Sequence, residues 1–417
     1  MKNVTKPISK KLEIAGYLKQ VEPQPVLFGN VAESKFSVMG NIFCSKDDFA
    51  AYFGSQKENI IPMMINAIEN PSKPAVVKEA ACQEVVNLSP SLDDLPILFH
   101  CEGDGGNYIS SGVMIAKHPV HGQNMDFHRC MQFSKTEMAV RVVRNRHFDT
   151  FLRELGEVDV AICIGNSPNV LAAGASSVEL GQDELEIANT LEPLDVVRAK
   201  TVDLFVPAEA EFVLEGIVTL KRLHDEGPFV DLTETHDFIR QEPVFELKAI
   251  THRKDAIWQA LLPGAFEHKL LMGMPREPTI YKKVNEVVKC LDVNVSPGGS
   301  SWLHAVVQIE KIQADDGKKA IEAAFQGHRS CKHVFVVDED IDIYDPLEVE
   351  WAMATRFQGD QDLIIKEKER GSSLDPSSEP ENSLTTKIGF DLTKPLQPSG
   401  KAFEKVDFPK VNLSEYE

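Results

Sequence analysis

The sequence predicts an α+β protein, with a central β region between two regions in which helices and strands alternate. Three observations support this. Helical and strand-like patterns alternate before residue 100, strand-like runs dominate the middle of the chain, and a strand-helix-strand rhythm begins after residue 281. We expect three domains, formed by residues 1–100, 101–275 and 276–417. A chain of 417 residues is long enough for each domain to bury its own core.

The N-terminal region should combine helices with short strands. Helical periodicity marks residues 10–22, 46–52 and 58–70, and the apolar run 25–28 is typical of a strand. A proline-rich stretch at 89–97 then interrupts regular structure, so we place the end of this α/β region near residue 100.

The central region should be a largely antiparallel barrel or sheet. Its strand-like runs show β-branched residues and apolar residues at every second position, and they cover 111–116, 125–133, 138–143, 158–164 and 201–206. One helical pattern, at 182–191, interrupts them.

The C-terminal region should contain a parallel sheet covered by helices. Strand-like segments at 287–295, 305–312 and 334–337 alternate with a helical pattern at 318–324. Residues 366–386 are polar and rich in Ser, Pro and charge, which predicts a mobile loop or lid.

Charge and cysteine usage exclude some classes of function. Acidic residues outnumber basic ones 64 to 44, and the net charge of −20 disfavours binding to nucleic acid or to an anionic membrane. No apolar run reaches the roughly 18 residues of a membrane span, and no secretory signal is visible at the N-terminus. The seven cysteines form no Cys-x-x-Cys pair, as expected of reduced thiols. We therefore expect a cytoplasmic protein.

The stretch 224–231, His-Asp-Glu-Gly-Pro-Phe-Val-Asp, places Glu226 and Asp231 on either side of a Gly-Pro break. A turn after Gly227 and Pro228 can direct both carboxylates into one cleft, whereas a helix would carry them to different faces. Two carboxylates in a low-dielectric site do not both ionise easily, so one can act as a proton donor near neutral pH. An acidic surface turn is the alternative interpretation.

A second group of residues can bind a cation and a carboxylate. Asn124 and His147, together with a carboxylate, can coordinate a divalent cation, while Arg129 offers a planar fork that fits a carboxylate. Residues 183–189 form a short helical pattern from which Glu184 can turn inward as an oxygen ligand. The alternatives are a surface histidine at a strand end and a solvated acidic helix face.

Lys332 stands just before the apolar strand 334–337, where its ammonium group can hold a phosphate. The acidic residues that follow it, as far as Asp342, can bind a metal or cap the next helix. Spacing alone does not choose between these roles.

Taken in order, these blocks resemble the UbiD family of decarboxylases, which use prenylated FMN. The resemblance runs from about Asp93 to Pro395, and several ordered motifs are more specific than any single one. The motifs are Asn124-x4-Arg129, Val206-Pro-Ala-Glu-Ala-Glu-Phe-Val-Leu-Glu-Gly216, Glu226-Gly-Pro-Phe229 with Asp231, Pro243-Val-Phe, Ala249-Ile-Thr-His-Arg253, the block 332–342, Gly371-Ser-Ser-Leu-Asp-Pro376 and Gly389-Phe-Asp-Leu-Thr-Lys-Pro395.

The resemblance implies roles for these residues. Arg129, Glu226 and Asp231 would form a catalytic trio, with Arg129 also beside the cofactor. Asn124, His147 and Glu184 would hold Mn2+ or Mg2+ against the phosphate of prenylated FMN, which Lys332 would grip. A monovalent ion such as K+ often lies near such sites.

The family fold implies three parts. They are a small N-terminal α/β domain, a flavin-reductase-like split barrel that binds prenylated FMN, and a C-terminal α/β oligomerisation domain. The protein would then be a homo-oligomer that receives its cofactor from a flavin prenyltransferase.

The implied reaction is a non-oxidative decarboxylation of an unsaturated carboxylic acid. Loss of CO2 from an sp2 carbon leaves an unstabilised carbanion, and prenylated FMN supplies an electron sink through a covalent adduct. Arg129 would orient the substrate carboxylate, Glu226 would hold Arg129, and Asp231 would deliver the proton. A non-catalytic flavin-binding protein of the same fold is the alternative from a different class.

Three arginines bear on the substrate. Arg141, Arg144 and Arg146 crowd one predicted strand, on which Arg144 and Arg146 would share a face. Positive charge in an acidic protein suits a phosphate on the substrate. A short chain of this character resembles the archaeal branch of the family that converts trans-anhydromevalonate 5-phosphate to isopentenyl phosphate for isoprenoid biosynthesis. If the arginines pair with acids instead, an aryl acid such as 4-hydroxybenzoate or 3-polyprenyl-4-hydroxybenzoate is the expected substrate.

Overall fold

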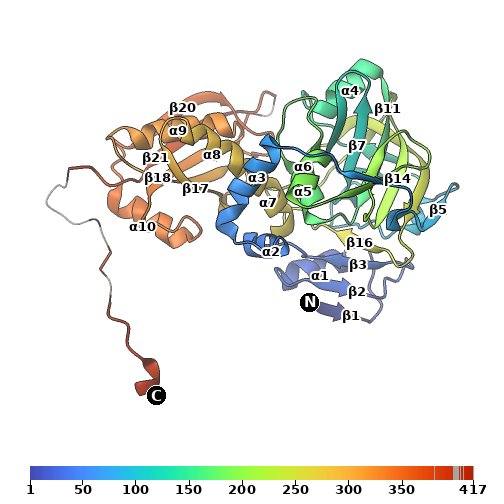
Figure 1. Ribbon diagram of the computed structural model, residues 1–417, viewed down its shortest axis with the longest axis horizontal. Coiled ribbons are helices and arrows are strands. Elements are labelled where there is room, and N and C mark those ends of the chain that lie inside the picture. Colours follow the sequence, from blue (N-terminus) through green and yellow to red (C-terminus); the bar gives the residue numbers. More distant parts are fainter. Residues whose placement is uncertain (380, 398–402, 404, 407, 417) are drawn as a thin grey trace.

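The computed structural model describes residues 1–379, 381–397, 403, 405–406 and 408–416. Within them the chain forms four β-sheets with helices packed around and between them (Figure 1). The α-helices are α1 (Glu13–Val21), α2 (Lys46–Tyr52), α3 (Ile60–Glu69), α4 (His147–Leu155), α5 (Pro168–Ala175), α6 (Glu184–Leu191), α7 (Phe266–Gly273), α8 (Glu277–Asn285), α9 (Asp316–Gly327) and α10 (Pro346–Arg356).

The N-terminal sheet takes one of its four strands from much later in the chain. Its order is β1 (Lys2–Val4), β2 (Val26–Phe28), β3 (Ser37–Gly40) and β16 (Ile257–Ala260). β16 pairs in parallel with β3, so a strand from later in the chain completes this sheet. The predicted domain limits at residues 100 and 275 stay a prediction.

The central sheet has nine curled strands, and every pairing in it is antiparallel, as the alternating pattern predicted. The strands are β5 (Val85–Asn87), β6 (Asn107–Ile109), β7 (Val113–His118), β8 (Gly122–Phe127), β9 (Cys130–Gln132), β10 (Glu137–Val140), β11 (Glu157–Ile164), β14 (Phe212–Glu226) and β15 (Arg240–His252). Their order is β6-β9-β10-β15-β14-β11-β7-β8, with β5 pairing beside β15.

Three predicted strands of the central region differ from the structure. The run 125–133 is broken at His128 and Arg129, which separate β8 from β9. Residues 141–146 form no strand, so Arg144 and Arg146 do not share a strand face. Of the run 201–206, only the last two residues enter β13 (Phe205–Pro207). β13 joins β12 (Asp195–Arg198) and β4 (Ala75–Val77) in a separate three-stranded sheet.

The C-terminal sheet is mixed, which corrects the prediction of a parallel sheet. Its inner pairings, β18 with β19 and β19 with β21, are parallel, whereas both outer strands pair antiparallel. The strands are β17 (Lys289–Val295), β18 (His304–Glu310), β19 (His333–Asp338), β20 (Leu363–Arg370) and β21 (Leu384–Asp391).

The predicted loop at 366–386 is only partly a loop. Its first five residues belong to β20 and its last three to β21. β20 is the edge strand of the sheet, where exposed charged side chains are tolerated, so polar composition concealed it.

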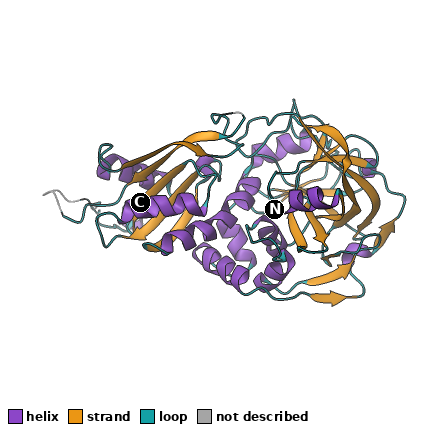
Figure 2. Ribbon diagram, turned by 90° about the horizontal axis from the view of Figure 1, so that it is seen from above, coloured by secondary structure: helices purple, strands orange, loops and turns teal. Residues whose placement is uncertain are grey.

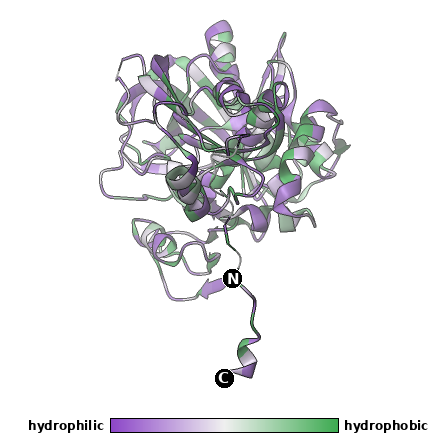
Figure 3. Ribbon diagram, turned by 90° about the vertical axis from the view of Figure 1, so that its left-hand side faces the viewer, coloured by the Kyte–Doolittle hydropathy of each residue, from purple (hydrophilic) through white to green (hydrophobic). Residues whose placement is uncertain are grey.

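The central sheet is buried on both faces. Along β7, Met114 and Ala116 join an apolar cluster that reaches the N-terminal sheet, while Val113 and Ile115 join a cluster with α5 and α6. Helices fill the space between the central and C-terminal sheets (Figure 2). Apolar and polar segments alternate through the body of the protein, and the last described residues project away from it (Figure 3).

Two further sequence expectations can be compared with the structure. In the described part of the chain, no helix has the length and apolar character needed to cross a membrane. All seven cysteines are unpaired, as the absence of a Cys-x-x-Cys pair predicted.

Candidate active site

Arg129 lies in the gap between β8 and β9 and contacts three carboxylates. Its Nε and Nη2 donate to the two oxygens of Glu226 at 2.9 and 3.1 Å. Nη1 donates to Asp231 Oδ2 at 2.6 Å, and Nη2 donates to Asp237 Oδ2 at 3.0 Å. The structure therefore brings together the three residues that the sequence singled out, and it adds Asp237.

The end of β14 and the turn that follows position these carboxylates. Glu226 is the last residue of β14 and is fully buried. Gly227 has a φ of +99°, a conformation that favours glycine. Tyr108 fixes the turn, because its hydroxyl accepts from the Gly227 N–H at 3.0 Å and donates to the Pro228 carbonyl at 3.3 Å. The loop beyond this turn carries Asp231 and Asp237 back to Arg129.

The charges of the site are strongly coupled. Burial acts to lower the pKa of Arg129, but attraction to Glu226, and then to Asp231 and Asp237, outweighs it and raises this pKa. Burial acts in the opposite sense on Asp237, yet hydrogen bonding to Arg240 and attraction to Arg129 lower the pKa of Asp237 to about 2. The guanidinium of Arg129 also lies over the Phe229 ring, 4.6 Å from its centre. Arg129 is thus a permanently charged and rigidly held group.

His268 of α7 is a second group near Asp231 that the sequence did not reveal. Burial lowers the pKa of His268, and the opposing effect of Asp231 does not restore it. Its Nδ1 accepts from the Gly264 N–H at 3.0 Å, so in the neutral ring the proton lies on Nε2. No local motif marks His268, whereas Asp237 could have been found as the next aspartate on the loop of Asp231.

Asn124, His147 and Glu184 gather around β8. His147 Nδ1 lies 3.0 Å from Asn124 Oδ1. Cis ligands of an octahedral ion at about 2.1 Å also stand about 3.0 Å apart. Glu184 is buried at the start of α6 and accepts from the Met125 N–H at 2.8 Å. Two oxygen donors and one imidazole form a ligand set that can hold a divalent cation such as Mn2+.

The environment of these residues favours a bound cation. Burial raises the pKa of Glu184 well above its ordinary value, so a nearby positive charge would stabilise its carboxylate. Burial also lowers the pKa of His147, which leaves the imidazole neutral and able to coordinate. Asn124 Nδ2 is buried without a hydrogen-bond partner in the described chain, and this N–H donor would suit an acceptor such as a phosphate oxygen beside the cation.

Two of the alternative interpretations are wrong. His147 is the first residue of α4 rather than a strand end, and it is partly buried. Glu184 points inward with 3% of its surface exposed, so it does not lie on a solvated helix face.

Lys332 belongs to the C-terminal sheet, where it precedes β19. Its Nζ lies 2.8 Å from Asp375 Oδ2 and donates to Ser377 Oγ at 2.6 Å. If Lys332 binds the cofactor phosphate as predicted, its ammonium group must exchange Asp375 and Ser377 for that phosphate.

The three arginines of the predicted substrate region separate in the structure. Arg141 pairs with Glu242 at 2.7 Å, as the alternative interpretation expected. Arg144 and Arg146 are exposed, and Arg146 lies close to Arg276. Burial and Arg146 lower the pKa of Arg276 to about 10, and no described carboxylate offsets them.

The fold and this site define a carboxy-lyase. Three family models cover the chain, described as the 3-octaprenyl-4-hydroxybenzoate carboxy-lyase N-terminal domain at residues 1–68, the Rift-related domain at 75–266 and the C-terminal domain at 269–392. The chain therefore belongs to the UbiD family of decarboxylases.

Its relatives are similar over their whole length. The chain is 40% identical over 408 residues to the anhydromevalonate phosphate decarboxylase of Methanocaldococcus jannaschii, which covers 96% of each protein. The UbiD-class enzyme HmfF from Pelotomaculum thermopropionicum, solved in complex with FMN, is 35% identical with a TM-score of 0.96 and covers 100% of this chain and 96% of that one. An evolved dimeric form of HmfF, in complex with prenylated FMN, is 34% identical with a TM-score of 0.92 and the same coverage.

Proposed function

We propose that this chain uses prenylated FMN to decarboxylate trans-anhydromevalonate 5-phosphate to isopentenyl phosphate. One observation carries the proposal. Glu226 accepts hydrogen bonds from Nε and Nη2 of Arg129, while Asp231 accepts a hydrogen bond from Nη1. The similarity to an anhydromevalonate phosphate decarboxylase along 96% of the chain supports the choice of substrate.

The residues present fit the cofactor and its metal. The Asn124 side-chain oxygen, the neutral His147 and the buried Glu184 would hold Mn2+ or Mg2+ beside the cofactor phosphate. Lys332 would contact the same phosphate, with K+ as a further ion near the site. Prenylated FMN, when bound, supplies the electron sink for the negative charge that loss of CO2 creates.

The hydrogen bonds of Arg129 indicate how a substrate carboxylate would enter. Contacts to Glu226, Asp231 and Asp237 engage four of the five N–H groups of the guanidinium. Asp231 is the most exposed of these carboxylates, with 17% of its side chain accessible, whereas Glu226 is fully buried. Asp231 would therefore yield Nη1 to the substrate, while Glu226 keeps the guanidinium plane fixed.

A displaced Asp231 is suited to the proton transfer that completes the reaction. Once displaced from Arg129, Asp231 can take up a proton from solvent. After the carbon–carbon bond breaks and CO2 leaves, Asp231 would give its proton to the carbon that held the carboxyl group.

Arg146 and Arg276 would attract the phosphate end of the substrate. Their positive charge lacks a described carboxylate partner, and Arg276 is held over the Trp302 ring at 5.2 Å.

We further infer that the nine-stranded sheet is a flavin-reductase-like split barrel and that the C-terminal sheet supports a homo-oligomer. A flavin prenyltransferase would supply the mature cofactor.

The test is an assay of two substrates with one enzyme. The chain would be co-expressed with a flavin prenyltransferase, and CO2 release would be measured with trans-anhydromevalonate 5-phosphate and with 4-hydroxybenzoate. We expect isopentenyl phosphate from the first substrate and no phenol from the second. Turnover of the aryl acid alone would overturn the choice of substrate. Bound prenylated FMN without turnover of either compound would instead support a non-catalytic flavin-binding protein.

A further inference from the structure

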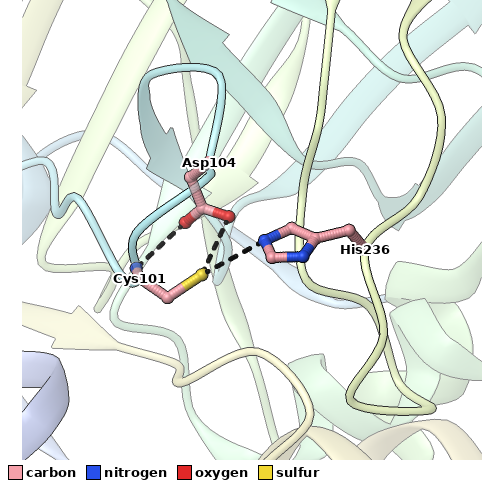
Figure 4. Close-up of side chains that lie close together, drawn as sticks. All are labelled: Cys101, Asp104 and His236. Atoms are coloured by element: carbon pink, nitrogen blue, oxygen red, sulfur yellow. Dashed lines mark hydrogen bonds between the residues drawn. The ribbon is translucent and has the colours of Figure 1, made fainter.

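Cys101, Asp104 and His236 form a cluster beside the loop that carries Asp231 (Figure 4). Cys101 and Asp104 precede β6, and His236 lies on the loop between β14 and β15. Cys101 Sγ lies 3.3 Å from Asp104 Oδ1 and 3.6 Å from His236 Nε2. Asp104 Oδ2 also accepts from the Cys101 N–H at 3.2 Å, which fixes the carboxylate against the thiol.

The cluster connects two segments that are far apart in sequence. Asp104 Oδ1 accepts from the Val230 N–H at 3.3 Å, and Val230 pairs across the loop with His236. Asp231 follows Val230 directly. Gly103 permits the close approach, because a Cβ at this position would lie only 3.1 Å from His236 Nε2. A ligand that joins Cys101 to His236 would therefore fasten the loop of Asp231.

We propose that Cys101, Asp104 and His236 bind a thiophilic divalent cation, for which Zn2+ is the best fit. Thiolate, imidazole and carboxylate are its usual protein ligands. Tetrahedral zinc, with Zn–S of about 2.3 Å and Zn–N of about 2.0 Å, holds sulfur and nitrogen about 3.5 Å apart. The measured separations of 3.6 and 3.3 Å match this spacing, and all three donor atoms lie within 4.8 Å of one another.

The position of the cluster leaves room for a fourth ligand. His236 is exposed and Cys101 is partly exposed, whereas Asp104 is buried. Water can therefore reach the side of His236 and complete a tetrahedral shell. This site is separate from the Asn124, His147 and Glu184 group, which lacks sulfur and suits a harder ion.

A second cluster on the chain serves as a control. His118 Nε2 and His121 Nε2 lie 3.3 and 3.2 Å from Glu154 Oε2, on the β7–β8 hairpin and α4. This cluster also has metal-like spacing but contains no cysteine. A thiolate signal therefore distinguishes the Cys101 site from it.

Cation binding would affect turnover through the loop, a consequence that rests on the proposed function. In that function Asp231 must leave Arg129 to admit the substrate carboxylate. A cation that ties His236 to Cys101 and Asp104 restrains the residues on both sides of Asp231. We therefore expect the occupied site to slow decarboxylation without displacing the flavin.

The binding test is a Co2+ titration of the full chain with Mn2+ already present. Co2+ bound to thiolate gives a charge-transfer band in the near ultraviolet, and a difference spectrum removes flavin absorption. We expect the band in the wild type and in His121→Ala, and no band in Cys101→Ser. Co2+ should bind at least tenfold more weakly to His236→Ala. Addition of Zn2+ should remove the band from the wild type. No band in the wild type, an equal band in Cys101→Ser or unchanged binding in His236→Ala would overturn the site. Thermal unfolding of each variant shows that it is folded.

A separate assay tests the effect on the loop. Each holoenzyme would be assayed with and without Zn2+, so that every variant is compared with itself. We expect Zn2+ to slow the wild type and His121→Ala at least tenfold more than Cys101→Ser. Equal slowing of all three would overturn the restraint of the loop, while the spectroscopic result decides the binding site independently. A failure of the proposed function would leave the Co2+ spectra unchanged.

Discussion

Arg129 and Glu226 stand 97 positions apart in the chain and are joined by two parallel hydrogen bonds of 2.9 and 3.1 Å. Such a bidentate pair fixes the plane of the guanidinium as well as its charge. Glu226 is fully buried at the end of a long strand, so the plane is set by the rigid central sheet. Nη1 of Arg129 is thereby directed towards Asp231.

The substitution Arg129→Lys should remove this fixed plane while keeping a positive charge. A lysine ammonium cannot make the two parallel bonds to Glu226, and it would leave Asp231 or Asp237 without its partner. We expect decarboxylation to fall about a hundredfold or more. CO2 release measured at matched flavin content provides the check, and a rate above one tenth of the wild-type rate would contradict this account.

Asp231→Asn should abolish turnover with the flavin still bound, because the amide cannot supply the proton. We expect a loss of about a hundredfold to ten-thousandfold in kcat. Asp237→Asn is the matched control, since Asp237 shares Nη2 with Glu226 and its loss leaves Arg129 held. Its effect should be much smaller. An unchanged rate in Asp231→Asn would remove Asp231 as the proton donor.

Gly105→Ala should disturb the turn that carries the catalytic loop. A Cβ at Gly105 would lie 2.2 Å from the carbonyl oxygen of Gly227, and backbone cannot easily move aside. We expect a loss of about 1–3 kcal/mol in the free energy of unfolding, together with a lower kcat. Gly16→Ala, where nothing lies within 4 Å in the exposed face of α1, should be neutral or stabilising. Urea unfolding of both variants measures the difference, and equal stabilities would count against the close contact.

Glu267 should make stability depend on pH. It lies buried in α7, where burial raises its pKa from 4.5 to about 7. Because the folded protein holds this proton more tightly than the unfolded chain does, the stability it contributes is lost as pH rises from 4.5 to about 7. This gap corresponds to roughly 3 kcal/mol. Glu267→Gln, which keeps an oxygen for the Ile42 N–H, should therefore gain stability relative to the wild type as pH increases. Parallel pH profiles in urea unfolding would refute this.

Local pattern was sufficient to predict the antiparallel central sheet, whereas the grouping of Glu226 and Asp231 with Arg129 was implied by the family resemblance. Local pattern was not sufficient for strand pairing, which depends on contacts between distant segments. β14 continues through the exposed residues Lys221 to Asp225, whose polarity hides the strand in the sequence. After an irregularity in the register, Leu223, His224 and Asp225 pair with β15, and no local signal reports that pairing.

The positions of the charged residues could be predicted only in part. Asn124 contacts His147, and Glu184 accepts from the N–H of the neighbouring Met125, but the metal-binding roles that the family resemblance implied stay a prediction. Arg141 found a partner in Glu242, 101 residues away, which the spacing of the arginines could not show. Lys332 likewise pairs with Asp375, a residue of the segment read as a loop or lid.

The late strand β16 has a consequence for synthesis on the ribosome. Ser37 to Gly40 receive their neighbours Ile257 to Ala260 only after the intervening polypeptide has been translated. The β3 edge of the nascent N-terminal sheet stays unpaired while the nine-stranded sheet is translated. An unpaired edge strand can associate with other chains. The N-terminal sheet is thus translated before the central sheet but completed after it.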